Sequence, residues 1–192
     1  MDALKEAQLA LPTDRVELRP GRVLAVHHRP SSSGSRDVAI FVHGSCASMV
    51  QWREQIENMA ATGVSVVAYD FYGCGRSAKP QEWSCYAMDE LYQDLVEVAR
   101  RYGAVEALGG RNLVVAHSLG CSLALRMAAE WGTNGVNVSA LALLGAMDAV
   151  PEAATGPLFR LPLCLLNWLQ PLLSAGFETR ALHEQTRLAL TP

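Results

Sequence analysis

Ser118 is the residue whose sequence surroundings best fit a catalytic role. It stands between an apolar run at residues 112–117 and an apolar-periodic stretch at residues 121–131. This pattern predicts a strand, a sharp turn with Ser118 at its tip, and a helix. Such a turn lifts a hydroxyl clear of the sheet, and the helix behind it directs unpaired backbone N–H groups toward the reacting atoms. Ser118 is therefore the candidate nucleophile.

The residues around Ser118 have the spacing of a nucleophile turn, in which small residues stand two positions before and two positions after the serine. Here they are Ala116 and Gly120, whereas the usual pattern has glycine at both positions. Small residues are needed because the strand and the helix pass close to the turn. His117 adjoins the serine, but neighbouring side chains at a strand end point apart, which makes it a poor base.

The segments on both sides of this turn predict alternating strands and helices. Strands are expected at residues 37–42, 64–69, 112–117 and 136–144, helices at 48–61, 86–102 and 121–131, and a β-hairpin at 15–27. This order predicts an α/β fold, a mostly parallel sheet with helices on both faces. The loops at His43, Asp70, Ser118 and Met147 then leave one edge of the sheet and face one crevice.

The composition suits one domain with an appendage. The chain has 192 residues, of which half are hydrophobic and 18% are charged, and its net charge is -3. This balance gives no electrostatic reason to expect a nucleic-acid partner. The first ten residues carry mixed charge and no continuous apolar block, so they do not resemble a secretory signal.

The sequence predicts neither a metal nor a cofactor. Its five cysteines have no paired spacing, which argues against a zinc site and a disulfide framework and favours a reducing compartment such as the cytoplasm. Gly73 and Gly75 lack the continuation of a dinucleotide fingerprint. Cys121, near the start of the predicted helix, is interpreted as a buried packing residue in preference to an acidified thiol.

Three linked motifs in this order resemble the α/β-hydrolase fold family. They are Val42-His43-Gly44, Asp70-x-x-Gly73-x-Gly75-x-Ser77 and Ala116-His117-Ser118-Leu119-Gly120. The resemblance covers about residues 15–150 and implies that residues 1–150 form the N-terminal part of a hydrolase core. It also implies that residues 151–192 form a lid segment, which more weakly resembles the eighth mammalian subgroup of abhydrolase-domain proteins.

The same resemblance implies an oxyanion hole formed by the backbone N–H groups of Ser45 and Leu119. Two preorganised donors of this kind commonly lower a barrier by a few kcal/mol. Because backbone groups act here, the two side chains are free to vary. The resemblance gives His43 a structural role, and Asp70 is interpreted as a residue that hydrogen-bonds its own glycine-rich loop.

A serine nucleophile needs a base and an orienting acid, which the family places after the serine in the order acid, then histidine. His183 is the one histidine downstream of Ser118, in a polar stretch of the lid segment. It is either the base or, as we favour, a solvated lid residue. Asp148 is either the acid or the cap of a loop.

The apolar part of the lid segment bears on the substrate. Residues 161–177 contain no charge and are interrupted by Pro162 and Pro171, so they are too short and broken for a comfortable membrane span. A lid over the crevice would favour a lipophilic ester or acyl substrate. The alternative is a shallow interfacial helix that makes peripheral membrane contact.

Residues 139–144 are expected to form an apolar edge of the sheet, because the sequence after them predicts no seventh or eighth strand. A partner covering that edge, or a longer parent protein, would explain it. We therefore expect an incomplete catalytic domain of a serine hydrolase that acts on carboxylic esters or lipid acyl groups. The alternative is a catalytically inactive binding or interaction module that has kept the crevice.

Overall fold

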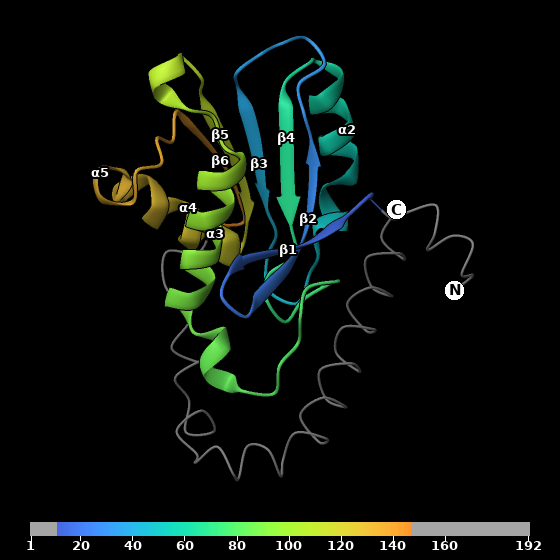
Figure 1. Cartoon of the computed structure of the whole chain (residues 1–192), viewed down its shortest axis with the longest axis vertical. Helices are drawn as coiled ribbons and strands as arrows, with labels where there is room; N and C mark the ends of the chain where they lie inside the picture. Colours follow the sequence, from blue (N-terminus) through green and yellow to red (C-terminus); the bar gives the residue numbers. More distant parts are fainter. Residues whose placement is uncertain (1–10, 147–192) are drawn as a thin grey trace, which may run out of the picture. The chain divides into compact units, whose positions relative to one another are not determined.

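The computed structural model describes residues 11–146, which form one mixed sheet covered by helices (Figure 1). Its strands are β1 (Asp14–Arg19), β2 (Arg22–Arg29), β3 (Val38–Val42), β4 (Ser65–Tyr69), β5 (Asn112–His117) and β6 (Ala140–Leu144). Their order across the sheet is β1-β2-β4-β3-β5-β6. The β1–β2 and β2–β4 pairs are antiparallel, and the other pairs are parallel. The expected α/β fold is confirmed.

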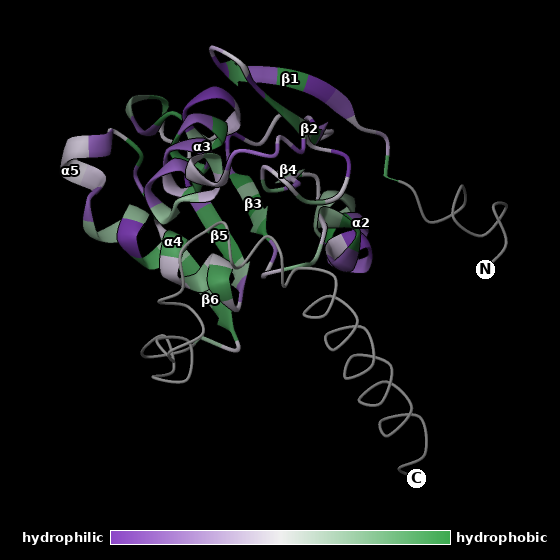
Figure 2. Ribbon diagram, turned by 90° about the horizontal axis from the view of Figure 1, so that it is seen from below, coloured by the Kyte–Doolittle hydropathy of each residue, from purple (hydrophilic) through white to green (hydrophobic). Residues whose placement is uncertain are grey.

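The helices lie on both faces of this sheet. They are α2 (Arg53–Ala61), α3 (Met88–Tyr102), α4 (Leu119–Ala129) and α5 (Trp131–Asn134), with the 3-10 turns η1 (Met49–Trp52), η2 (Trp83–Tyr86) and η3 (Glu106–Leu108). Seen from below, the apolar strands lie between α2 on one side and α3 and α4 on the other (Figure 2). Within residues 11–146, no helix combines the length and the apolar character required to cross a membrane.

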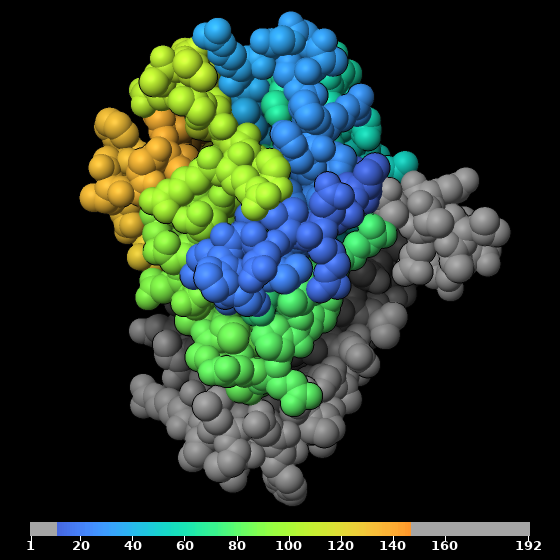
Figure 3. All heavy atoms as spheres, viewed as in Figure 1, coloured from blue at the N-terminus to red at the C-terminus, as the bar shows by residue number. Residues whose placement is uncertain are grey.

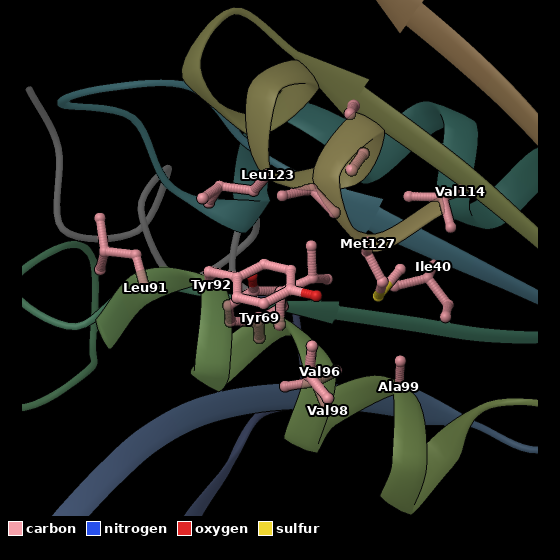
Figure 4. Packing of buried hydrophobic residues seen from close by; sticks show 14 of the residues in the cluster. Ile40, Tyr69, Leu91, Tyr92, Val96, Val98, Ala99, Val114, Leu123 and Met127 are labelled. Atoms are coloured by element: carbon pink, nitrogen blue, oxygen red, sulfur yellow. The ribbon is translucent and has the colours of Figure 1, made fainter. Parts of the chain in front are cut away.

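Two hydrophobic clusters separate the faces of the sheet. In β3, whose five residues are all buried, Ile40 packs into the cluster with α3 and α4, and Phe41 packs into the cluster with α2. Figure 4 labels Ile40, Tyr69 and Met127 among the side chains of the first cluster. A strand buried on both faces explains why the sequence of β3 is a continuous apolar run.

The β1–β2 hairpin is attached to α3 by a buried ionic cluster. The carboxylate of Asp94, which is fully buried, accepts hydrogen bonds from Arg19 Nη2 and Arg22 Nε at 2.7 Å each. Arg22 also donates to the second carboxylate oxygen, and its guanidinium lies 4.0 Å from the centre of the Tyr72 ring. In Figure 3 the blue hairpin lies directly against the green α3.

Strand β6 is shorter than expected and is the last strand of the sheet formed by residues 11–146. It begins at Ala140, whereas the sequence predicted a strand from residue 136. Side chains hold the preceding segment in a loop, because Asn134 Oδ1 accepts the Val136 N–H and Asn112 Nδ2 donates to the Asn137 carbonyl. Leu144 is 46% exposed, so the strand presents apolar surface as expected.

Helix α4 packs very close to the end of β3. A Cβ atom added at Gly120 would lie 2.7 Å from the carbonyl oxygen of His43 and 2.9 Å from that of Val42. Real Cβ atoms do not approach so closely, and a backbone carbonyl cannot swing away as a flexible side chain can. Glycine at position 120 is therefore a requirement of this packing, as the sequence pattern predicted.

Replacing Asp94 with alanine should lower the free energy of unfolding by about 3–5 kcal/mol, since it removes the buried partner of Arg22 and leaves only Glu90, a more exposed carboxylate 3.6 Å away. Urea denaturation followed by tryptophan fluorescence measures the change. The matched control is Glu57→Ala, which removes a partner from the exposed ion pair with Arg29 and should change stability by less than about 0.5 kcal/mol. Equal effects of the two substitutions would contradict this account of Asp94.

Replacing Gly120 with alanine should lower the free energy of unfolding by about 1–3 kcal/mol, because the added methyl group overpacks α4 against β3. Chemical denaturation gives the value. Gly132→Ala in α5 is the control, since a Cβ there meets nothing within 4 Å, and it should be neutral or mildly stabilising. A harmless Gly120→Ala substitution would show that the close packing is absent in solution.

Candidate active site

Ser118 occupies a strained turn between β5 and α4. Its backbone angles are φ 49° and ψ -119°, a region that residues with a side chain rarely adopt. Two backbone hydrogen bonds hold it there: the Ser118 N–H donates to the Leu144 carbonyl at 2.9 Å, and the Ser118 carbonyl accepts from the Cys121 N–H at 2.9 Å. The strand, turn and helix predicted around Ser118 are present, and α4 begins at the next residue, Leu119.

The loop after β3 lies directly beside this turn. Strands β3 and β5 are parallel neighbours, with Val42 opposite Ala116, so both chains leave the sheet at the same edge. A Cβ atom built on Gly44 would lie 3.1 Å from the Cβ of Ser118. Ser45, the next residue, is exposed. The structure thus brings the loop of Ser45 next to Ser118.

Leu119 occupies the first position of α4, where a backbone N–H has no acceptor within its own helix. Two predicted backbone donors, at Ser45 and Leu119, therefore lie on the two segments that adjoin Ser118. Donors at such positions stabilise an oxygen that gains negative charge during reaction. Their use as an oxyanion hole stays a prediction.

His43 anchors the loop after β3. Its ring is fully buried, and Nε2 accepts the Phe71 N–H at 2.9 Å, so the ring proton resides on Nδ1, which donates to the Gly44 carbonyl at 2.7 Å. Burial lowers the pKa of His43, and the nearby His117 imidazole contributes a smaller effect in the same direction. A neutral imidazole with both nitrogens occupied has the structural role expected from the sequence.

Asp70 organises the loop after β4. Its Oδ1 accepts the Met49 N–H and its Oδ2 accepts the Arg76 N–H, both at 2.7 Å. A Cβ atom on Gly75 would fall 2.0 Å from Oδ2, so the loop wraps closely around this carboxylate. Oδ2 is bound by the loop after β4, which agrees with the interpretation of Asp70 as a loop residue, and Oδ1 also ties that loop to the start of η1.

Cys121 ties α4 to the strands beneath it. Its buried thiol donates to the carbonyls of Ala116 at 3.3 Å and Leu144 at 3.4 Å. Burial raises the pKa of Cys121, so the thiol stays protonated and unreactive at neutral pH. The interpretation of Cys121 as a packing residue is confirmed.

His117 makes a contact that sequence reasoning did not find. Its Nδ1 lies 2.8 Å from the position of a Cβ atom built on Gly44, in the loop after β3. The glycine after the buried His43 is the signal that could have revealed this contact, since a small residue there leaves room for a neighbouring side chain. His117 is exposed at the carboxyl edge of the sheet.

The predicted acid and base, Asp148 and His183, and the lid segment lie outside the described residues. Within residues 11–146, no imidazole or carboxylate is hydrogen-bonded to the hydroxyl of Ser118. In the same part of the chain, no three metal-binding side chains converge into a group that could hold an ion. The described site therefore consists of a serine and nearby backbone donors.

Comparison with curated proteins shows partial matches to two kinds of protein. The chain is 30% identical over 156 residues to "Protein ABHD8" of Homo sapiens, covering 79% of this chain and 34% of that protein. It is 36% identical over 106 residues to "Epoxide hydrolase B" of Mycobacterium tuberculosis, covering 55% of this chain and 28% of that protein. The chain thus spans about a third of the length of these relatives.

Solved structures of similar fold include the "Thioesterase Domain From Curacin Biosynthetic Pathway". It has a TM-score of 0.63 at 23% identity, covering 79% of this chain and 52% of that chain. Another, one of the "Novel epoxide hydrolases belonging to the alpha/beta hydrolases superfamily in metagenomes from hot environments", has a TM-score of 0.59 at 27% identity, covering 78% and 48%. The model of the alpha/beta hydrolase family matches residues 39–191. With that match and the strained serine turn at the carboxyl edge of its sheet, the chain belongs to the alpha/beta hydrolase family.

Proposed function

We propose that this chain carries the acyl-accepting part of a serine hydrolase that acts on lipophilic carboxylic esters or lipid acyl groups. The observation that carries the proposal is the backbone of Ser118, held at φ 49° and ψ -119° beside the loop of Gly44. Strain of this kind persists where surrounding structure enforces it, and it concentrates at functional sites. A hydroxyl raised in this way is accessible to a carbonyl carbon.

In the proposed reaction, Ser118 Oγ attacks the ester carbonyl and forms a C–O bond, while the carbonyl oxygen gains the electron pair. The N–H groups of Ser45 and Leu119 stabilise that oxyanion. Collapse expels the alcohol, which takes the proton that the serine lost, and leaves an acyl group on Ser118. Water then releases the acid by the same sequence of steps.

The proton in these steps requires a base, and we propose that it comes from outside residues 11–146. His43 is unsuitable because both of its ring nitrogens are hydrogen-bonded in the core. His183 with Asp148, or groups of a longer parent protein, are the candidates. Without such a base Ser118 would be a weak nucleophile, and the chain would serve instead as a binding or interaction module.

Epoxide opening is the second candidate reaction, and it is suggested by the names of several relatives. The chemistry of a serine disfavours it. Attack of the Ser118 hydroxyl on an epoxide carbon would form an alkyl ether, which offers no carbonyl for water to attack, so the enzyme would be consumed. Attack on an ester forms an acyl-serine, which water can hydrolyse. Ser118 therefore favours carbonyl substrates.

A fluorophosphonate probe should label the 192-residue chain at Ser118, and Ser118→Ala should abolish labelling. Gel fluorescence and peptide mass spectrometry measure the outcome. The control is Ser45→Ala, which removes an adjacent hydroxyl and keeps the backbone N–H, and it should be labelled like the unmodified protein. Absence of labelling in a folded chain would favour the binding-module alternative.

Intact-mass spectrometry should distinguish the two reactions. Incubation with 4-nitrophenyl butyrate should add a butyryl group to Ser118, and incubation with styrene oxide should add nothing and release no diol. The Ser118→Ala variant is the blank for both reagents. Catalytic conversion of the epoxide to a diol that depends on Ser118 would overturn the preference for esters.

A further inference from the structure

The imidazole of His117 bridges two loops at the carboxyl edge of the sheet. Its Nδ1 is 2.8 Å from the position of a Cβ atom on Gly44, in the loop after β3. Its Nε2 and Cδ2 are 3.7 and 3.8 Å from the equivalent position on Gly145, just after β6. The ring therefore lies at the end of β5 between the segments that follow its two neighbouring strands, β3 and β6.

The ring fills the space that a side chain at position 44 would need. Gly44 does not have a positive φ, so its backbone conformation alone does not call for glycine. The contacts do: an added Cβ would meet His117 Nδ1, the Cβ of Ser118 and the His117 carbonyl oxygen at 2.8, 3.1 and 3.3 Å. The imidazole of His117 thus occupies the space that the glycine at position 44 leaves free.

Two imidazoles hold Gly44 from different directions. His43 donates a hydrogen bond to the Gly44 carbonyl from the core, and His117, at the exposed end of β5, occupies the space where a Cβ of residue 44 would lie. The residue that follows Gly44 is Ser45, whose N–H is the predicted oxyanion donor. The orientation of that N–H depends on the peptide planes which these two contacts constrain.

We propose that His117 is a positioning residue, whose ring fixes the Gly44–Ser45 backbone so that the Ser45 N–H faces the site beside Ser118. The catalytic consequence rests on the proposed function, whereas the ordering of the loop does not. His117 has this role through packing, because its Nδ1 fills the space beside Gly44. This role requires a flat ring of this size and does not require a charge.

Hydrogen exchange of the full 192-residue chain tests the ordering directly. His117→Ala should raise amide exchange of residues 44–47 about tenfold, and His117→Phe, which keeps a flat ring, should restore slow exchange. His28→Ala is the matched control, because that imidazole lies on β2 beside Ser65 and should leave the loop unchanged. Unchanged exchange in His117→Ala, or failure of His117→Phe to restore it, would overturn the proposal.

The rate of Ser118 labelling by a fluorophosphonate tests the consequence. His117→Ala should slow labelling about tenfold, and His117→Phe should stay within about threefold of the unmodified chain. Raised loop exchange without slower labelling would show that the ring orders the loop but does not position the donor, which overturns the proposal. An unmodified chain that is never labelled, together with raised exchange in His117→Ala, would support the ordering of the loop and favour the binding-module alternative over the ester-hydrolase function.

A double-substitution cycle tests the contact between Gly44 and His117 through thermal stability, without any measurement of catalysis or labelling. Gly44→Ala introduces a methyl group against the His117 ring and should lower the melting temperature. In the His117→Ala background the same substitution should lower the melting temperature by less than half as much, because the His117 ring no longer occupies the space of the added methyl group. Equal costs in both backgrounds would show that Gly44 and His117 do not share this space.

Discussion

The close approach of two backbone segments, the loop after β3 and the turn between β5 and α4, is the constraint on which the candidate site depends. Parallel neighbouring strands deliver both segments to one edge, and there is room for neither a side chain at Gly44 nor one at Gly120. With both positions reduced to glycine, a serine and two backbone donors fit within one small region. The positive φ of Ser118 is a strained conformation that results from packing the turn so closely against the loop.

Much of this arrangement was predictable from the sequence because it is encoded locally. The buried run of β3, the alternation of strands with helices, and the small residues that flank Ser118 each report a nearby steric or hydrophobic requirement. The structural role of His43 followed from family resemblance, and the structure adds the two hydrogen bonds that explain it. The loop role of Asp70 followed from its glycine-rich neighbours.

The features that escaped prediction depend on contacts between residues far apart in the sequence. Asp94 binds Arg22, which lies 72 positions earlier in the sequence, and no local pattern around either residue predicts this ion pair. Asn112 captures the Asn137 carbonyl and so shortens a strand whose own residues are suited to a longer one. The contact of His117 with Gly44 similarly joins two strands, so the rule for adjacent side chains within one strand could not reveal it.

The carbonyl of Leu144, the last residue of β6, accepts both the Ser118 N–H and the Cys121 thiol. Ser118, the candidate nucleophile, is thus hydrogen-bonded to β6, the outermost strand of the described sheet. Edge strands open at a lower free energy than central ones. Transient detachment of β6 would therefore break the hydrogen bond to the Ser118 N–H while the core remained intact. The persistence of the Ser118 turn would then depend on the pairing of β6, and a protein segment that paired with this strand would also stabilise the turn.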